Sequence, residues 1–181
     1  MFAGIDVGKR SCRLAVIDEK IIYIGNYEKR RLSGVVAVGI DAPLSLPEKG
    51  TLRKSEKELL NLGIRLFPSG ARFFMQIAIK GMEIAEELRK DGLKVFEVYP
   101  YATRVLMEIA PKARKRTKEG LKEIRNALSN YIEVPELGHD DIDAVISALT
   151  VREYMMGRGF LLHGEIVLPK GINIETPKIN K

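Results

Sequence analysis

The sequence predicts a single α/β domain in which a mixed sheet is covered by helices. The first 25 residues contain three short segments of apolar and β-branched residues, and beyond residue 35 apolar segments alternate with segments of helical periodicity. Consecutive strands followed by alternating strands and helices are typical of a sheet with both antiparallel and parallel pairs. At 181 residues the chain suits one domain, expected at residues 1–168, followed by a polar tail at residues 169–181.

The N-terminal part predicts a meander followed by a buried strand. Residues 2–7 and 11–18 are expected to pair as a hairpin through the polar turn GKRS, and residues 20–25 to add a third strand. The near-continuous apolar segment VVAVGID, residues 35–41, is typical of a strand buried on both faces. Residues 45–69 contain several turn residues and are expected to be irregular, apart from the short amphipathic stretch SEKELLNLG.

Helical periodicity dominates the rest of the chain. Apolar residues recur at helical spacing over residues 72–91, and LKVFEVY, residues 93–99, is typical of another buried strand. Two prolines then bracket a further helix, and Thr117 is placed to cap the next one. A last helix is expected at about residues 141–155, and GEIVLP, residues 164–169, is a candidate for one more strand.

The basic character of the chain favours a polyanionic partner. The net charge is +6 and the isoelectric point is near 9.4, and each Lys or Arg placed on a phosphate releases condensed counterions. The densest basic segment is KARKRTK, residues 112–118, so Arg114, Lys115 and Arg116 are candidate nucleic-acid contacts. A solvated loop leading into a helix explains such a run equally well.

Several classes of protein are excluded by composition. No apolar run approaches the roughly 18 residues that a membrane span needs, and charged residues interrupt the N-terminal apolar stretch too early for a signal peptide. We therefore expect a cytoplasmic protein with no membrane partner. One cysteine and two histidines argue against an internal disulfide and a structural zinc site.

Three acidic residues occur where apolar residues are expected. Asp6 ends the apolar strand FAGI, Asp41 ends VVAVGI, and Asp143 interrupts the helical run IDAVISALTV. Burying an ionised carboxylate costs several kcal/mol unless it is paired, hydrogen-bonded or bound to a metal. We therefore predict that the three acids converge on one site, and hard oxygen ligands favour Mg²⁺ or Mn²⁺ there.

Two further acids are candidates for the same site, and each acid has a structural alternative. Asp140 precedes Asp143 by three residues and is expected on the same helix face, and Glu97 lies in the predicted strand VFEVY. An aspartate at a strand end can instead accept hydrogen bonds from the following turn. Acids in a first helical turn can cap backbone N–H groups, which is the role we favour for Asp141.

The same motifs carry a family resemblance. GIDVGKRSCRLAVID resembles the first hairpin of the ribonuclease H-like superfamily, whose first strand carries an essential Asp, and VGIDAP resembles the strand that supplies another. HDDIDAVISAL is similar to the Asp-x-x-Asp-Ala helix of RuvC-type resolvases. Together with IDAPLSLP, GIRLFPSG and FEVYPYATR, these motifs closely resemble an uncharacterised family of predicted ribonuclease H-fold nucleases, domain of unknown function 429, over residues 1 to about 168.

The resemblance implies a mixed five-stranded sheet and a metal-dependent nuclease. Two Mg²⁺ or Mn²⁺ ions would act in phosphodiester hydrolysis, one activating water and the other stabilising the leaving oxygen. The carboxylates implied are Asp6, Asp41 or Glu97, Asp140 and Asp143. Lys9 and Arg10, on the turn beside Asp6, would contact the substrate phosphate, or simply form a polar turn. DNA and RNA both stay open as substrates, and because RuvC-type resolvases often dimerise, a homodimer is an open expectation.

Two other functions compete with the nuclease. The hairpin GIDVGKRSCRLAVID also resembles the first phosphate-binding hairpin of actin and sugar-kinase phosphotransferases. Such enzymes enclose a nucleotide between two related domains, and the chain has room for one. The third alternative is a nucleic-acid-binding module that keeps the fold and the basic surface without catalysis.

Overall fold

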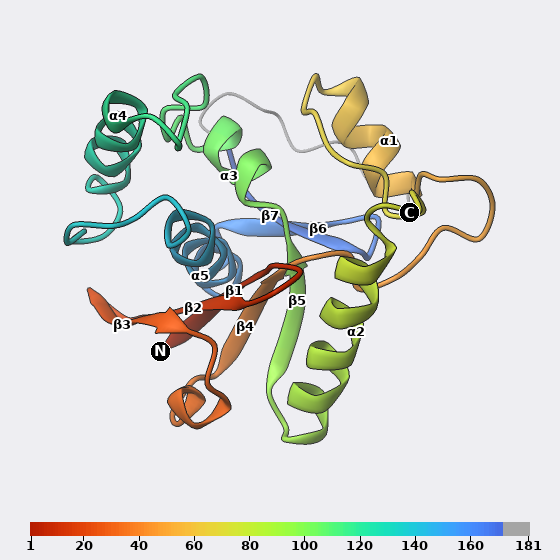
Figure 1. Ribbon diagram of the computed structural model, residues 1–181, viewed down its shortest axis with the longest axis horizontal. Helices are drawn as coiled ribbons and strands as arrows, with labels where there is room; N and C mark the ends of the chain where they lie inside the picture. Colours follow the sequence, from red (N-terminus) through yellow and green to blue (C-terminus); the bar gives the residue numbers. More distant parts are fainter. Residues whose placement is uncertain (172–181) are drawn as a thin grey trace.

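The computed structural model describes residues 1–171 and is built on one seven-stranded sheet (Figure 1). The strands are β1 (Phe2–Val7), β2 (Cys12–Ile17), β3 (Ile21–Asn26), β4 (Ala37–Asp41), β5 (Lys94–Val98), β6 (Gly159–Leu162) and β7 (Ile166–Pro169). The helices are the short 3₁₀ helix η1 (Lys29–Leu32), α1 (Lys54–Asn61), α2 (Met75–Lys90), α3 (Pro100–Leu106), α4 (Lys118–Leu128) and α5 (Ile142–Met155). The strand order is β3-β2-β1-β4-β5-β7-β6.

The first five strands have the predicted arrangement. β1, β2 and β3 form an antiparallel meander, and the turn between β1 and β2 is closed by a hydrogen bond from Gly8 N to Ser11 O of 3.1 Å. β4 then pairs parallel to β1, and β5 pairs parallel to β4. The predicted meander followed by alternating strands and helices is confirmed.

The predicted number of five strands is wrong, because the chain adds a hairpin beyond α5. β7 pairs parallel to β5 and covers its outer edge, and β6 pairs antiparallel to β7. The candidate strand at residues 164–169 is present from Ile166 onward. β6 is only four residues long, and its tight turn contains Gly164 with φ of +74°. An open edge of β5 would expose unpaired backbone groups, which this hairpin satisfies.

Helices cover both faces of the sheet. Apolar residues of β1, β2 and β4 pack on one face against Ile84, Ala85 and Leu88 of α2. On the other face, Ala15 and Ile17 of β2 pack against a cluster formed by α5 and α4. Figure 1 shows α2 and α5 on opposite sides of the sheet. α5 is buried along most of its length, which explains why its sequence is apolar on more than one side.

Two glycines allow α5 to lie directly on the sheet. Gly4 of β1 and Gly39 of β4 are register partners. A Cβ built on Gly4 would lie 2.1 Å from Ala144 O, and one on Gly39 would lie 2.7 Å from Ser147 O. Any side chain at either glycine would therefore push the helix off the sheet. Small residues of the helix occupy the facing positions: Ala144, Ser147 and Ala148.

The predicted helix caps are partly confirmed. Thr117 Oγ1 accepts a hydrogen bond of 3.1 Å from Gly120 N at the start of α4. The prediction that Asp141 caps α5 is wrong, because its side chain makes no capping hydrogen bond to the helix. No helix within residues 1–171 has the length and apolarity to cross a membrane. Most of the predicted polar tail, residues 172–181, lies outside the described residues.

Candidate metal centre

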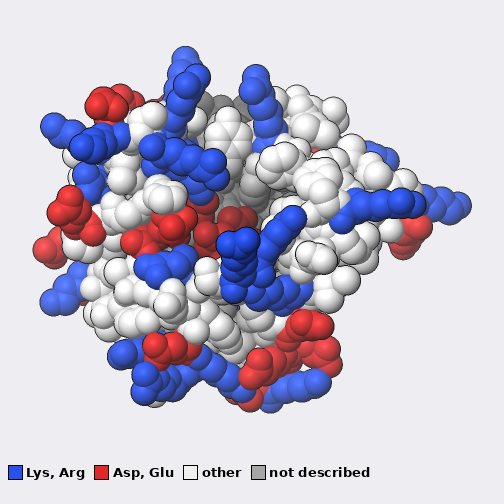
Figure 2. All heavy atoms as spheres, in the orientation of Figure 1, with Lys and Arg blue, Asp and Glu red and all other residues white. Residues whose placement is uncertain are grey.

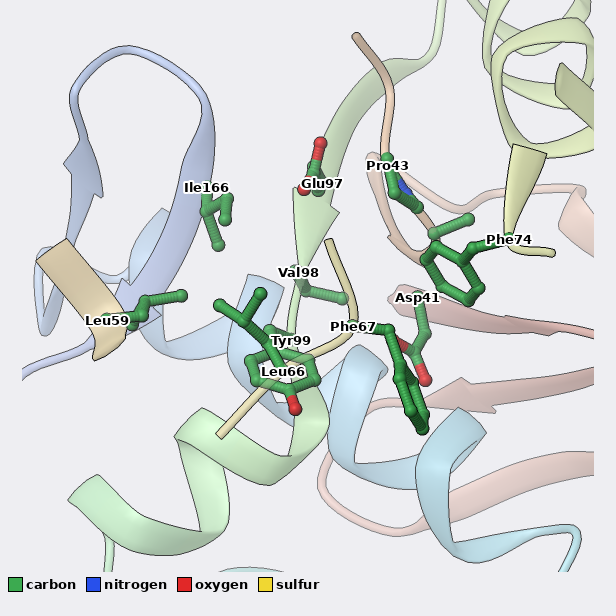
Figure 3. Close-up of a pocket in the computed structure, with 11 residues that line it drawn as sticks. Asp41, Pro43, Leu59, Leu66, Phe67, Phe74, Glu97, Val98, Tyr99 and Ile166 are labelled. Atoms are coloured by element: carbon green, nitrogen blue, oxygen red, sulfur yellow. The ribbon is translucent and has the colours of Figure 1, made fainter. Parts of the chain in front are cut away.

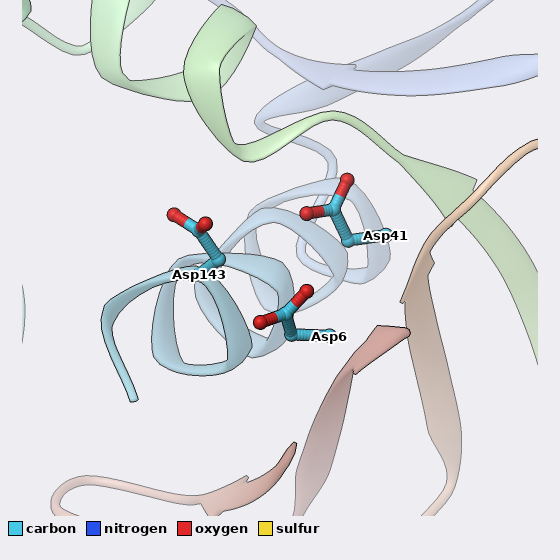
Figure 4. A group of neighbouring side chains, drawn as sticks. All are labelled: Asp6, Asp41 and Asp143. Atoms are coloured by element: carbon cyan, nitrogen blue, oxygen red, sulfur yellow. The ribbon is translucent and has the colours of Figure 1, made fainter. Parts of the chain in front are cut away.

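Asp6, Asp41 and Asp143 come together at one end of the sheet. Asp6 and Asp41 are register partners on parallel strands, each two residues beyond a glycine that faces α5. Because side chains alternate along a strand, both carboxylates point to the side that α5 covers. Asp143 lies in the first turn of that helix, and Figure 4 shows it facing the other two. One oxygen from each carboxylate lies within 4.8 Å of the others, so the predicted convergence is confirmed.

Burial and neighbouring carboxylates raise the pKa of two of the three acids, Asp6 and Asp41. Burial and repulsion by Asp143 raise the pKa of Asp6 to about 6. Burial, with repulsion by Asp143 and Asp6, raises the pKa of Asp41 well above its ordinary value. Clustered negative charge in a partly dry site is unfavourable unless a cation or protons compensate it. The cluster is therefore electrostatically suited to bind a cation.

Lys115 provides part of that compensation. Its ammonium group donates a hydrogen bond to Asp143 Oδ2, and its charge opposes the rise in the pKa of both Asp6 and Asp41. Hydrogen bonds hold the backbone that precedes the lysine. Ala113 O accepts a 3.0 Å hydrogen bond from Arg104 Nη2. Arg114 O accepts a hydrogen bond from the Thr117 hydroxyl. Lys115, predicted as a nucleic-acid contact, thus reaches into the carboxylate cluster from a fixed loop.

Asp141 forms an ion pair with Arg13 instead of capping α5. Arg13 of β2 is the register partner of Asp6 and donates from Nε to Asp141 Oδ1 over 3.0 Å. A second bond of 2.9 Å runs from Arg13 Nη1 to Asn26 Oδ1. Asp141 Oδ2 also accepts a 3.1 Å hydrogen bond from Gly138 N. These contacts fix the loop that precedes α5 against β2 and so orient the first turn that carries Asp143.

Glu97 lies outside the group of three, because it pairs in register with Ile40 and its side chain points to the face of the sheet opposite Asp41. Its carboxylate accepts hydrogen bonds of 2.8 and 2.5 Å from the Arg53 guanidinium and one of 2.7 Å from Leu44 N. The side chains of Glu97 and Arg53 are only 6% and 2% exposed. Glu56 also lies 3.4 Å from the guanidinium. Glu97 therefore anchors the segment between β4 and α2.

The remaining predicted site residues are exposed. Asp140 is 70% exposed, and its Oδ1 lies 3.1 Å from His139 Nε2. It is not part of the group of three, although its charge contributes to the raised pKa of Asp6. The exposed basic residues among those predicted for the site are Lys9, Arg10, Arg114 and Arg116. Figure 2 shows acidic side chains near the centre of one face of the molecule, with lysine and arginine side chains around them.

Asp6→Asn is expected to flatten the pH dependence of stability in the metal-free protein. The pKa of Asp6 is about 6 in the folded chain, so between about pH 4 and pH 6 the folded state binds more protons than the unfolded state. The free energy of unfolding from this source falls by about 1 to 2 kcal/mol as the pH rises through that window. Urea denaturation at several pH values in EDTA measures the effect, and equal slopes for variant and wild type would contradict it.

The strand order, with three acids at one end of the sheet, agrees with the mixed sheet that the resemblance to the ribonuclease H-like superfamily implies. Residues 4–166 match the model of the family described as protein of unknown function, DUF429, and the chain belongs to that family. No curated protein matches the sequence. The chain is similar to the solved structure of Thermus thermophilus RuvC, at 16% identity and a TM-score of 0.43 over 86% of this chain and 95% of that chain. It is also similar to T. thermophilus RuvC in complex with Holliday junction substrate, at 14% identity and a TM-score of 0.43 over 87% and 97%.

Two structural features of the site are not predictable from the sequence. Arg53 lies in a segment expected to be irregular, and nothing in the sequence pairs it with Glu97, 44 positions away. The sequence does not predict the contact between Lys115 and Asp143, because a basic run of this kind indicates a surface that is either solvated or in contact with nucleic acid. Nothing in the sequence distinguishes the one lysine that turns inward from the solvated basic residues beside it.

Proposed function

We propose that this protein is a metal-dependent nuclease that hydrolyses phosphodiester bonds in nucleic acid. The observation that carries the proposal is the set of three aspartates whose carboxylate oxygens lie within 4.8 Å of one another. They come from two adjacent parallel strands and from the helix across them, and burial with mutual repulsion raises the pKa of both Asp6 and Asp41. Carboxylates arranged in this way are used by enzymes that cleave phosphodiesters with two divalent ions.

The donor set fits Mg²⁺ or Mn²⁺. Hard carboxylate oxygens are the ligands these ions prefer, and Mg²⁺ sites commonly use one or two carboxylates together with substrate phosphate. Asp6, Asp41 and Asp143 would hold the ions, and the exposed Asp140 would complete the shell on the solvent side. Bound divalent ions supply an activated water and stabilise the charge on the leaving oxygen.

The chain's own cations would bind the substrate. Lys115 contacts Asp143 and is anchored by a fixed backbone, so its ammonium group is placed to contact a phosphate at the same site. Lys9 and Arg10 lie exposed on the turn that follows Asp6, and Arg114 and Arg116 flank Lys115. These residues would bind the phosphate backbone, and such contacts do not depend on the base sequence.

A cleavage assay tests the proposal. Labelled single-stranded and duplex DNA and RNA are incubated with the protein and Mg²⁺, Mn²⁺ or EDTA. Cleavage that requires the divalent ion is expected for at least one substrate. Tight binding of nucleic acid without cleavage under any ion would instead support the non-catalytic binding module and overturn the proposed activity.

Lys115→Met is expected to strengthen Mn²⁺ binding to the free protein, by about tenfold. The lysine neutralises part of the charge that attracts the ion, and its removal leaves the carboxylates uncompensated. The same variant should lose cleavage, because the phosphate loses a cation. Calorimetric titration with Mn²⁺ measures the affinity, with Lys118→Met, at an exposed position nearby, as the control. Unchanged or weaker Mn²⁺ binding in Lys115→Met would show that the lysine does not compete with the ion.

Replacing Arg114 and Arg116 with alanine is expected to weaken nucleic-acid binding without changing sequence preference. Removing one arginine that binds a phosphate should reduce the slope of log affinity against log salt by about 0.7 to 0.9. The double variant should therefore show a slope smaller by up to about 1.8 units. Anisotropy titrations from low to moderate salt measure it. An unchanged slope would assign both arginines to the solvated loop.

A further inference from the structure

Two aromatic side chains are exposed on the segment between α1 and α2. Phe67 is 66% exposed and Phe73 is 59% exposed. The Phe67 ring meets Phe73 edge to face at a centroid distance of 5.7 Å and lies 6.0 Å from the ring of Phe74. A cluster of exposed aromatic rings costs free energy in water and commonly marks a surface that binds something.

The segment is held by buried contacts. The Glu56 carboxylate accepts hydrogen bonds of 3.0 Å from both the backbone N and the hydroxyl of Ser69, which is fully buried. The same carboxylate accepts a 2.8 Å bond from Arg53 N, and the Arg53 guanidinium is bound to Glu97. Ile64 is 1% exposed and packs in a core cluster with β7. The rings are therefore presented by a fixed loop, so binding a ligand there requires little additional ordering.

The aromatic surface is continuous with the metal centre. Phe67, Phe74 and Tyr99 line one hollow together with Asp41, as Figure 3 shows. Asp41 is also one of the three clustered carboxylates. A group resting against Phe67 would therefore be adjacent to whatever Asp41 binds.

Positive charge flanks the same surface. Arg65 and Arg72 lie on either side of Phe67 in the sequence, and both are exposed. Neither forms an ion pair within residues 1–171. Alternation of cations with stacking rings matches a strand of nucleic acid, in which phosphates alternate with flat bases. An apolar peptide or lipid would not use the carboxylate site next to the rings.

We infer that Phe67, with Phe74 and Tyr99 beside it, is a stacking shelf for an unpaired base of the strand whose phosphate lies at the three aspartates. The position of that phosphate rests on the proposed function. A base in a regular duplex has both faces covered by its neighbours, so the shelf favours single-stranded or locally unpaired nucleic acid. This assigns a substrate class to the site and a role to the motif GIRLFPSG.

Phe67→Trp gives a direct optical test, because the chain contains no tryptophan. The probe is a thymidine strand of about 20 nucleotides in EDTA, long enough to cover a typical single-strand site, compared with a strand of the same length made of abasic sites. Quenching of the tryptophan emission is expected with the thymidine strand only. Met156→Trp is the control, because Met156 is similarly exposed, at 55%, beyond the opposite end of α5 from Asp143. It should show no quenching.

Affinity measurements complete the test. Phe67→Ala should weaken binding of the thymidine strand roughly 5- to 100-fold with an unchanged salt slope, and Phe67→Trp should retain it. Binding of the abasic strand should not change. Equal binding of both strands by the wild type, or an unquenched Phe67→Trp, overturns the shelf even if metal-dependent cleavage is present. Wild-type dimers that Phe67→Ala dissociates would identify a second copy as the occupant and also overturn it. If the tryptophan is quenched only by the strand with bases but the protein cleaves no substrate, the stacking shelf is supported and the proposed nuclease activity is rejected.

Discussion

Asp6→Asn is expected to reduce metal-dependent cleavage by at least about 1,000-fold, equivalent to about 4 kcal/mol of transition-state stabilisation. The amide keeps the size of the side chain but removes the charge that would hold a divalent ion between β1, β4 and α5. Without metal at neutral pH, the variant should be as stable as the wild type or about 1 to 2 kcal/mol more stable, because repulsion among the carboxylates is relieved.

Single-turnover cleavage measures the loss of activity, and urea denaturation separately measures the change in stability. Asp18→Asn is a matched control, because Asp18 is 59% exposed and follows β2 at the other end of the sheet. It should leave cleavage unchanged. A marked loss of stability in Asp6→Asn would mean that Asp6 is a structural hydrogen-bond acceptor, and the catalytic assignment would lose its main support.

Glu97→Gln should lower the free energy of unfolding by about 3 kcal/mol. The substitution leaves the charge of Arg53 buried without its main partner, and such losses typically cost about 3 to 5 kcal/mol. We expect the lower end of this range because Glu56 stays 3.4 Å from the guanidinium. The segment that carries Phe67 should also loosen, since Arg53 and Glu56 fix it to β5.

Urea denaturation checks this prediction, and hydrogen exchange over residues 53–74 reports the loosening. Glu86→Gln is the control, because Glu86 forms an exposed pair with Lys90, and such pairs contribute little to stability. A Glu97→Gln protein with wild-type stability and no activity would show that Glu97 acts in catalysis. Glu97→Gln is thus expected to lower stability, whereas Asp6→Asn is expected to keep or raise it.

The sequence predicts the elements that have a strong periodicity of their own. The meander, the buried strands, the helix over residues 72–91 and the Thr117 cap depend on local patterns, and all are present. The convergence of Asp6, Asp41 and Asp143 is also predictable, because each charge interrupts an apolar element at its end. The parallel pairing of β1 with β4, in the register observed, places Asp6 beside Asp41.

The remaining features depend on contacts between distant segments. Glu97 and Asp41 look alike in sequence, because each is a charge near the end of a buried strand, but the register of β4 and β5 places them on opposite faces of the sheet, and Arg53 binds Glu97. The contact of Lys115 with Asp143 depends on the path of the loop before α4. The extra hairpin of β6 and β7 is hard to predict because its strands have four residues each. For Glu97 and Lys115, the deciding partner lies far away along the chain.

Anomalous diffraction from crystals soaked in Mn²⁺ tests the central claim most directly. We predict at least one Mn²⁺ peak between the carboxylates of Asp6, Asp41 and Asp143, with the Lys115 ammonium group displaced from Asp143. Asp6→Asn crystals soaked in the same way should show a weakened peak or none. A wild-type crystal at saturating Mn²⁺ with no peak at the three aspartates, and Lys115 still bound to Asp143, would contradict the metal centre and the nuclease built on it.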